Sequence, residues 1–341
     1  MAPGAAIEDD GRVQHPDPVA VRELVGSAAD VRRSASTGEL GTTLPPFIDH
    51  HVHLALIDEG RLIEGGIAGV VDLGGDPFAF ARRARSGMPH VEYAGAFLTA
   101  PGGYPSGRSW APAEIVREVS SASTHPGVAG GAATAVDEQA ACGASVIKVA
   151  LHRAAGPVFD AATLAAIVEL ARERGLPVVA HVEGEGMPLL ALDAGVDALA
   201  HTPFTETLDA ALVRRAARAG QRWISTLDIH RDDPGARGHA RANLAAYAAA
   251  GGRVLYGTDL GNGDLPIGVN AAEIAALEEC GVRGAALVAA LTDPWPAGAD
   301  HGAAGVATFI PGPVPADLDA VPGWLAGARV VPTEELLHDD H

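Results

Sequence analysis

The sequence predicts an α/β protein built on a (β/α)8 TIM barrel, and three observations support this fold class. From residue 47 onward, short β-branched runs alternate with longer segments rich in Ala, Leu, Glu and Arg. Several of these runs follow a glycine that closes a helix-like segment, as in "RERGLPVVAH" (172–181), which suits a helix that feeds a buried strand. The alternation repeats eight times over roughly 250 residues, as in TIM barrels.

The expected strands, in chain order, are "FIDHHVHL" (47–54), "GVVDL" (69–73), "VEYAGAFL" (91–98), "SVIKVAL" (145–151), "PVVAHV" (177–182), "DALAHT" (197–202), "RWISTL" (222–227) and "RVLYGTD" (253–259). Between them, the clearest helical segments are 160–174, 186–194, 206–219, 238–250 and 270–280. A doubly wound open sheet is the alternative arrangement. It lacks its usual phosphate signal, because neither GxGxxG nor GxxxxGK[ST] follows the first strand.

The two ends of the chain differ from this barrel, to which we assign residues 47–304. Residues 1–46 mix Pro, Gly, Ser and charged residues, with one weak helix near 18–33. Residues 305–341 contain five prolines and end in an acidic tail with histidines. We therefore expect short, eroded ancillary segments at both ends, 1–46 and 305–341, rather than a second functional domain.

Composition and charge narrow the range of partners. The chain has 24 basic and 43 acidic residues, a formal charge of −19 with neutral histidine, and such a surface repels nucleic acid and anionic lipid. No apolar run approaches the ~20 residues that cross a bilayer, and the first residues lack an apolar signal region. Because the only cysteines are Cys142 and Cys280, we expect a reducing, cytoplasmic location. A small-molecule substrate is the expected partner, and homo-oligomer formation is left open.

The first expected strand carries three histidines in four positions, in the stretch "LPPFIDHHVHLALID" (44–58). Residues two apart in a strand share a face, so His51 and His53 point the same way and His50 points the opposite way. At the C-terminal end of a barrel strand the shared face is the inside of the barrel mouth, where two neutral imidazoles can hold one metal. This HxH pattern alone is weak, because packed or surface histidines explain it at least as well.

Further metal-ligand residues occupy equivalent places on later strands. Lys148 lies inside an otherwise apolar strand, His181 and His201 end the runs "PVVAH" and "DALAH", and Asp259 ends "VLYGTD". Charged groups are seldom buried without a partner. Side chains at the mouths of different barrel strands meet at one point, so together with the HxH pair these residues predict a metal centre.

Lys148 requires a special state in such a centre, because a protonated amine repels divalent metals. Burial and nearby cations lower a lysine pKa and expose the neutral amine. A neutral amine can add carbon dioxide to give a carbamate, whose two oxygens can bridge two metals. A lysine that snorkels, or that pairs with a carboxylate of the barrel, is the alternative.

These motifs resemble those of the amidohydrolase superfamily, in particular its imidazolonepropionase-like and Xaa-Pro dipeptidase-like branch. The stretch "FIDHHVH" resembles the family's first-strand D-x-H-x-H, with Asp49, His51 and His53 in register. "GASVIKVAL" resembles the segment with the carboxylated lysine, "VVAHVEGEGMPLLALDAGVDALAHTPF" resembles the fifth and sixth strands, and "VLYGTDLG" resembles the eighth. "FLTAPGGYPSG" is similar to the third-strand loop of that branch. The resemblance covers about residues 47 to 292.

The resemblance implies a binuclear centre with two divalent ions, expected to be zinc, with manganese, cobalt or iron as alternatives. His51, His53 and Asp259 would bind the more buried metal, His181 and His201 the second, and carboxylated Lys148 would bridge both. A hydroxide between the metals would attack the substrate carbonyl, with Asp259 as general base. Asp49 is expected to support the ligands without binding metal.

Three loop residues are expected to contact substrate. Tyr104 can donate a hydrogen bond to a tetrahedral oxyanion, Arg153 can bind a carboxylate, and His230 can contact the leaving group. The alternatives are a rim aromatic, a solvated arginine and a surface histidine. Tyr104 stands in "GGY", where the branch often has histidine, and the Pro-rich ends argue that the family's β-sandwich is eroded or absent.

The sequence thus predicts a metal-dependent hydrolase of a C–N bond in an amide, dipeptide or cyclic amide. Deaminases of this superfamily place a glutamate three residues after the fifth-strand histidine, where this chain has Gly184, which argues against a mononuclear deaminase. A lactonase or phosphotriesterase-like enzyme on the same centre is the nearest alternative. A ring-opening or ring-closing enzyme of a biosynthetic pathway and a non-catalytic metal-binding barrel also stay open.

Overall fold

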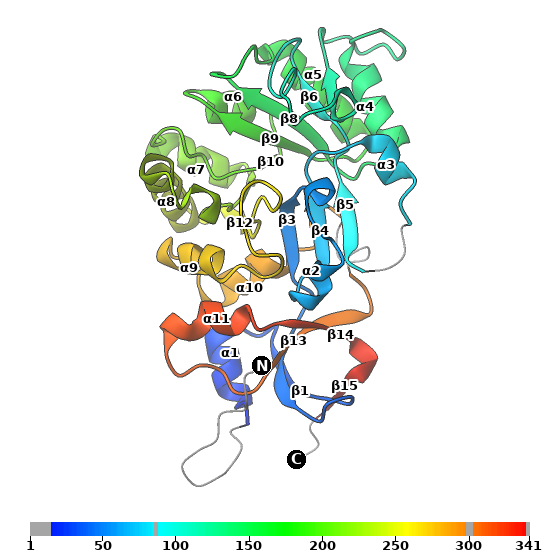
Figure 1. The fold of residues 1–341 in the computed structure, drawn as a ribbon. Coiled ribbons are helices and arrows are strands. Elements are labelled where there is room, and N and C mark those ends of the chain that lie inside the picture. The colour runs from blue at the N-terminus through cyan, green and yellow to red at the C-terminus, as the bar shows by residue number, and fades with distance from the viewer. Residues whose placement is uncertain (1–14, 85–87, 298–302, 339–341) are drawn as a thin grey trace.

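The computed structural model describes residues 15–84, 88–297 and 303–338, and it has an α/β fold with two parallel sheets (Figure 1). One sheet has three strands in the order β3-β4-β5, and the other has seven in the order β12-β11-β10-β9-β8-β6-β7. Their bounds are β3 Ile48–Val52, β4 Gly69–Asp72, β5 His90–Tyr93, β6 Phe97–Thr99, β7 Val116–Glu118, β8 Ile147–His152, β9 Val178–Glu183, β10 Ala198–Leu199, β11 Arg222–Ile224 and β12 Arg253–Leu255.

The two parallel sheets are connected at two places. Residues 94–96 connect β5 to β6, so the predicted strand 91–98 is split in two, because Gly95 there has φ +73°, outside the range of a strand. At the other place, the backbone N–H of His50 donates to Tyr256 O at 3.0 Å, and that of His53 donates to Leu260 O at 2.8 Å. The residues that follow β12 therefore lie alongside β3.

Helices alternate with these strands, as the sequence predicts. The five expected helical segments appear as α5 to α9, and side chains of Asp160, Asp233 and Asn270 accept backbone N–H groups at the starts of three of them. The helices are α1 Pro18–Val25, α2 Arg61–Glu64, α3 Pro77–Ala81, α4 Ala132–Ala141, α5 Ala161–Glu173, α6 Met187–Asp193, α7 Ala210–Arg218, α8 Pro234–Ala249, α9 Ala271–Glu279, α10 Gly284–Thr292 and α11 Val321–Leu325.

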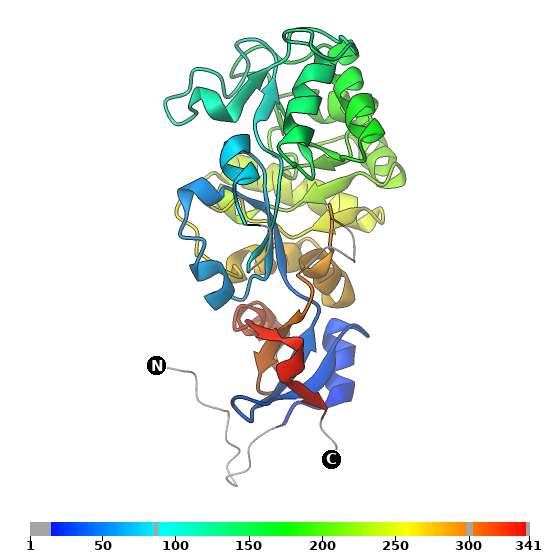
Figure 2. The same ribbon diagram turned by 90° about the vertical axis from the view of Figure 1, so that its right-hand side faces the viewer.

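The two ends of the described chain form more regular structure than the sequence predicts. The helix expected near 18–33 ends at Val25, and strands from both ends build one five-stranded antiparallel sheet in the order β14-β13-β2-β1-β15. Figures 1 and 2 show this sheet below the parallel strands, with α1 and α11 beside it. Its strands are β1 Asp30–Ser34, β2 Leu40–Leu44, β13 Val306–Pro311, β14 Arg329–Pro332 and β15 Leu336–His338.

The pairing of β2 with β13 explains why local sequence did not reveal this sheet. Thr43 pairs with Phe309 and Leu44 with Thr308, so partners lie more than 260 residues apart in the chain. The strands are short, and β14 ends at Pro332, which cannot donate to a ladder. A strand of this kind is stabilised by its distant neighbours rather than by its own residues.

The core runs between the helices and the parallel sheets, where large side chains pack closely. Trp223 of β11 stacks on Tyr247 of α8 with ring centroids 3.9 Å apart, and both are almost fully buried. Such pairs add about 0.5–1.5 kcal/mol beyond the area they bury. They fix the helix layer against the strands, which in turn sets the positions of the strand ends.

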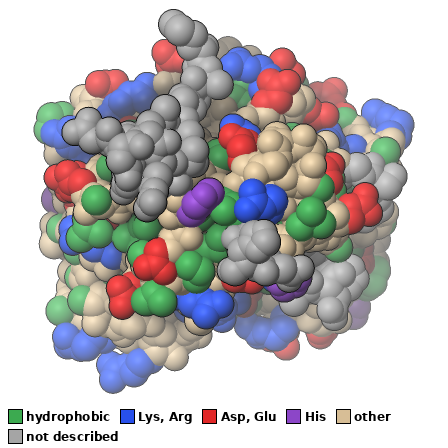
Figure 3. Space-filling view, turned by 90° about the horizontal axis from the view of Figure 1, so that it is seen from below, with side chains coloured by type: hydrophobic (Ala, Val, Ile, Leu, Met, Phe, Trp, Pro, Cys, Tyr) green, Lys and Arg blue, Asp and Glu red, His purple; other side chains and the backbone are tan. Residues whose placement is uncertain are grey.

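The face of the molecule that carries the terminal sheet has side chains of mixed character. Figure 3 views the end with the terminal sheet, where acidic, basic and apolar side chains are interspersed over the part drawn in colour. No helix among the described residues is both long and apolar enough to cross a membrane.

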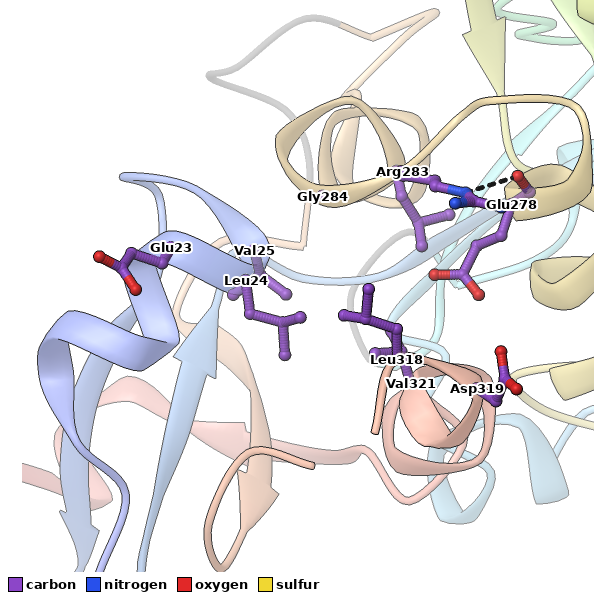
Figure 4. Close-up of a pocket in the computed structure, with 10 residues that line it drawn as sticks. Glu23, Leu24, Val25, Glu278, Arg283, Gly284, Leu318, Asp319 and Val321 are labelled. Atoms are coloured by element: carbon purple, nitrogen blue, oxygen red, sulfur yellow. Dashed lines mark hydrogen bonds between the residues drawn. The ribbon is translucent and has the colours of Figure 1, made fainter. Parts of the chain in front are cut away.

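A small hollow of about 220 Å³ lies where α1 and the segment before α11 meet α9 and α10. In Figure 4, Leu24 of α1 faces Leu318 and Val321, while Arg283 donates to the backbone oxygen of Glu278 at 2.8 Å. The hollow shares no lining residue with the cavity at the strand ends described next.

Candidate metal centre

A cavity of about 460 Å³ lies over the C-terminal ends of the parallel strands. His51, Lys148 and His181 lie in β3, β8 and β9. His53 directly follows β3, whereas His201 and Asp259 lie in the segments that follow β10 and β12. All six residues that the sequence predicts as metal ligands line this cavity: His51, His53, Lys148, His181, His201 and Asp259. Their role as ligands remains a prediction, but the fold brings them together at one place.

The inner part of the cavity is a tight cluster of two imidazoles and one carboxylate. Nε2 of His51 and Nε2 of His53 each lie 3.2 Å from Oδ1 of Asp259. Two ligands of a tetrahedral zinc lie about 3.3 Å apart, because zinc–ligand bonds are about 2.0–2.2 Å long. His201 adds a third imidazole, with its ring centroid 4.7 Å from that of His51 and a ligand atom within 4.8 Å of those of His51 and Asp259.

His51 is protonated at Nδ1, so the lone pair of its Nε2 points toward this cluster. Its Nδ1 lies 2.8 Å from the backbone oxygen of Ala200, an acceptor, so Nδ1 carries the proton and Nε2 does not. Within the described chain, Nε2 of His51 and Oδ1 of Asp259 are both buried and without a hydrogen-bond partner. Two unpartnered acceptors facing each other are unfavourable unless a cation lies between them. The donor set therefore fits a divalent metal.

Asp259 is held in an uncommon backbone conformation, with φ +60° at a residue that is not glycine. Its Oδ2 accepts a hydrogen bond from Nδ2 of Asn262 at 2.9 Å, which directs Oδ1 toward the histidines. Burial raises the pKa of this carboxyl, but the nearby His51, His53 and His201 outweigh burial and hold the pKa well below its usual range. Asp259 is therefore ionised at neutral pH.

Lys148 lies in the same cavity and is 1% exposed. Among the described residues it forms no ion pair, and its Nζ lies 5.8 Å from the centre of the Phe97 ring. Burial lowers the pKa of Lys148 to about 7, although Asp259 and Asp72 act in the opposite direction. A substantial fraction of the amine is thus neutral near pH 7, as carbamate formation requires.

Asp49 supports the first strand and His50 faces away from the cluster. Asp49 accepts the backbone N–H groups of His51 and Thr258, each at 3.0 Å, and the Thr258 hydroxyl at 2.6 Å, so it ties β3 to the segment that bears Asp259. The ring nitrogens of His50 lie 2.8 Å from the backbone oxygens of Tyr256 and Asp293, on the other side of the strand. The structure thus agrees with the expected alternation of faces.

On the outer side of the cavity, His181 has neighbours that the sequence did not single out as site residues. Oε2 of Glu183 lies 3.3 Å from Nε2 of His181 and 3.0 Å from Nδ1 of His152. A signal was present in the sequence: His152 is four residues after Lys148 and Glu183 is two after His181. On a strand these intervals keep the side chains on the face of the predicted ligands.

The three predicted substrate contacts occupy different positions. Tyr104 lines the cavity, and its ring stacks on that of His181 with centroids 5.2 Å apart. Arg153 is exposed and His230 packs against Phe204, with ring centroids 4.3 Å apart, and neither is among the lining residues of the cavity. Their roles toward substrate remain predictions.

The rest of the cavity wall is largely apolar. The aromatic rings of Phe97, Tyr104 and Trp110 form one side, with centroids 6.4 Å apart for Phe97 and Trp110 and 5.9 Å apart for Tyr104 and Trp110. Leu56 and Ile115 also contribute to the lining. Trp110 is 50% exposed at this wall, so a large apolar ring is available to a bound molecule.

Comparison with solved structures relates this fold to known hydrolases. An amidohydrolase structure aligns with a TM-score of 0.65 at 19% identity, over 87% of each chain. A Xaa-Pro dipeptidase with methionine bound in its active site aligns with a TM-score of 0.62 at 16% identity, over 87% of this chain and 86% of that one. Molinate hydrolase aligns with a TM-score of 0.62 at 15% identity, over 86% and 83%.

The sequence matches no family model and no curated protein. The structural likeness nevertheless extends over most of the chain. This chain therefore has the fold shared by the amidohydrolase, the Xaa-Pro dipeptidase and molinate hydrolase.

Proposed function

We propose that this protein is a metal-dependent hydrolase that cleaves a C–N bond in an amide, dipeptide or cyclic amide. The observation that carries the proposal is the convergence of unpartnered acceptor atoms of His51 and Asp259, with His53, at the floor of one cavity. The likeness to an amidohydrolase and to a Xaa-Pro dipeptidase supports a C–N bond as the target. We take the two joined parallel sheets as the wall of one closed barrel with this cavity at its mouth.

The residues present fit a binuclear centre. His51, His53 and Asp259 would hold the inner metal and His181 and His201 the second, and all five line the same cavity. Lys148, neutral near pH 7, would carry the carbamate that bridges the two. Bound zinc, or another divalent metal, would polarise the scissile carbonyl and lower the pKa of a water from 15.7 to about 7.

The chain's own groups would move the protons. Asp259 takes a proton from the attacking water at Oδ1, because Oδ2 is already engaged by Asn262, and passes it to the leaving nitrogen. Tyr104 donates its hydroxyl hydrogen to the developing oxyanion. Burial raises the pKa of Tyr104 to about 12, with Asp259 and Glu183 acting in the same direction, so the hydroxyl keeps its proton at neutral pH.

The apolar wall indicates what the substrate carries beside the scissile bond. Phe97, Trp110 and Ile115 line the cavity next to the polar floor. A Leu- or Phe-sized group that is removed from water gains about 1.5–3 kcal/mol. We therefore propose a substrate with an aromatic or aliphatic group on the acyl or the amine side.

Metal analysis followed by a substrate panel tests the proposal. Protein purified without chelator is expected to hold about two equivalents of transition metal per chain, measured by inductively coupled plasma mass spectrometry. The panel would contain N-acyl arylamides, Xaa-Pro dipeptides, cyclic amides, lactones and a paraoxon-type triester, with metal-stripped protein as the control. Turnover of amides that is lost on stripping and restored by zinc is the expected result. Turnover of lactones or triesters alone would favour a lactonase or a phosphotriesterase-like enzyme. If the protein binds no metal, the proposed metal centre is wrong.

A further inference from the structure

We propose that Asp72 is a positioning residue for the metal centre, because it fixes the backbone beside His53 and so orients the ring of that ligand. Asp72 ends β4 and is 1% exposed. It is neither one of the ligands predicted from the sequence nor one of the residues that line the cavity. The inference rests on the proposed function, since it concerns a ligand of the inner metal, and it leaves the assignment of the ligands unchanged.

His53 lies where the chain leaves β3. The strand ends at Val52, and His53, with φ −125° and ψ 88°, leads into a short 3-10 helix over Leu54–Leu56. The ring of His53 is therefore not fixed by its place in the strand, as that of His51 is. The backbone N–H of His53 donates to Leu260 O at 2.8 Å, which holds the main chain but leaves the direction of the ring to other contacts.

The two oxygens of Asp72 accept backbone N–H groups from two different turns. Oδ2 accepts from Leu54, the residue after His53, at 2.7 Å, and Oδ1 accepts from Gly74 at 2.9 Å. The backbone oxygen of Gly74 in turn lies 3.3 Å from Nδ1 of His53. β3 and β4 are parallel neighbours (Figure 1), so one carboxylate ties together the turns that follow both strands.

The contact with Gly74 decides which nitrogen of His53 faces the metal position. A carbonyl oxygen can only accept a hydrogen bond, so Nδ1 of His53 carries the proton. Nε2 is then the nitrogen that lies 3.2 Å from Oδ1 of Asp259. A hydrogen bond of this kind fixes both the tautomer and the direction of a histidine that binds metal. If the oxygen of Gly74 moved, the ring could turn and Nε2 would leave the cluster.

Gly74 depends on its neighbours for its conformation. Its φ is +151°, and a Cβ at this position would collide with the ring of Phe97, so the position requires glycine. Its own N–H is held by Asp72, and the N–H of the next residue, Gly75, donates to Gly95 O at 2.9 Å. Of these two contacts only the first involves a side chain, so it is the one that a substitution can remove.

Asp49 provides a comparison on the neighbouring strand. Its carboxylate accepts the backbone N–H of His51 at 3.0 Å, so each histidine of the HxH pair has one buried aspartate beside it. Asp49 belongs to the same short motif as His51, whereas Asp72 comes from the next strand. The pairing of Val52 with Asp72 in the register of β3 and β4 brings Asp72 to the turn that carries His53.

Metal binding by the full-length protein tests the proposal, with Asp72→Asn as the variant and Glu273→Gln as the matched control. Asparagine has one acceptor oxygen, so the N–H of Leu54 or Gly74 loses its partner. Glu273→Gln causes the same loss at another buried carboxylate that accepts two backbone N–H groups. The Kd for zinc is measured by calorimetry, and the absorption spectrum of cobalt-loaded protein reports the ligand geometry, both well below the melting temperatures.

Both variants are expected to lose thermal stability, but only Asp72→Asn should lose metal affinity. Its Kd for one zinc equivalent should rise about 10–100-fold with a changed cobalt spectrum, while Glu273→Gln stays within about twofold of wild type. A rise of less than about tenfold in Asp72→Asn would overturn the proposal. An equal rise in both variants would also overturn it, because lost stability alone would then explain the effect.

If Asp72→Asn does not fold, Asp72→Ser decides by the same criteria, because its small side chain leaves room for water at the lost contacts. Wild-type protein that binds neither zinc nor cobalt would contradict the proposed function itself. Failure of the positioning role and failure of the metal centre are therefore distinguishable.

Discussion

Two buried carboxylates in this protein have different surroundings. Glu273 in α9 is fully buried, and its two oxygens accept the backbone N–H groups of Leu227 at 2.9 Å and Asp228 at 2.7 Å. Asp259, 2% exposed, has one oxygen engaged by Asn262, while the other faces imidazole nitrogens without a hydrogen-bond partner in the described chain. The first carboxylate holds a loop to a helix, and the second lies in the cavity.

The difference teaches that burial of a charge does not by itself identify a functional site. Burial raises the pKa of Glu273 to about 7, and the hydrogen bonds from Leu227 and Asp228 only partly offset it. For Asp259, the nearby histidines outweigh burial. A carboxylate whose two oxygens are both hydrogen-bonded holds neighbouring elements together, whereas unpartnered groups that converge on one point indicate a ligand.

The largest effect is expected from Asp259→Asn. Removing the general base should lower kcat by about 10³-fold, within the usual ~10²–10⁴-fold range, while the variant should still fold, because the amide of asparagine has the size and shape of the carboxylate it replaces. Steady-state kinetics on a substrate from the panel and a thermal melt measure both. Full activity in this variant would show that another group is the base.

Lys148→Met tests a second buried charged group, the amine inside the cavity. The variant removes the amine that would bridge the metals, so bound metal should fall from about two equivalents to about one and kcat by about 100-fold. Stability should not fall, because an apolar side chain of similar volume replaces an unpaired buried amine. Metal analysis and urea unfolding report the two effects. Two tightly held equivalents in the variant would rule out the bridge.

Tyr104→Phe should have a smaller effect on the same reaction. Its ring would still stack on His181, so KM should change little. Loss of the hydroxyl should lower kcat by about tenfold, less than the ~10²–10³-fold cost of losing a buried oxyanion donor, because water can reach this partly exposed position. The split between kcat and KM is the measurement. A raised KM with kcat unchanged would make Tyr104 a binding residue only.

The smallest effect on activity, within about twofold, is expected from Glu273→Gln, which should act on stability. The glutamine amide has only one oxygen that can accept a hydrogen bond. One buried N–H of Leu227 or Asp228 therefore loses its partner, at a cost of about 1–3 kcal/mol. If the Glu273 variant lost activity but not stability, Glu273 would have a role in the reaction, and the distinction drawn between Glu273 and Asp259 would be wrong.

The pH dependence of this deficit follows from the pKa of Glu273. Between about pH 4.5 and 7 the folded chain binds a proton at Glu273 that the unfolded chain does not, so falling pH stabilises the wild type. The deficit of the glutamine variant should therefore grow from pH 8 to pH 5, by at most about 3 kcal/mol. Urea unfolding at several pH values measures it, and a deficit that does not vary with pH would contradict the raised pKa.

The sequence by itself determined the alternation of strands and helices and most of the polar floor of the cavity. The two-residue repeat of a strand places His51 and His53 on one face. Lys148 and His181 occupy equivalent positions on two later strands. These features depend on residues close together in the chain, where local periodicity and helix-ending glycines such as Gly175 are visible.

Only the tertiary structure decided the features that depend on distant partners. The terminal sheet pairs Thr43 with Phe309, and no local pattern encodes such a pairing. The register of β8 against β9 likewise decides that Glu183 comes within 3.0 Å of His152 and 3.3 Å of His181. Sequence spacing shows which face a side chain occupies, but which side chains come within bonding distance is decided by how the strands pack.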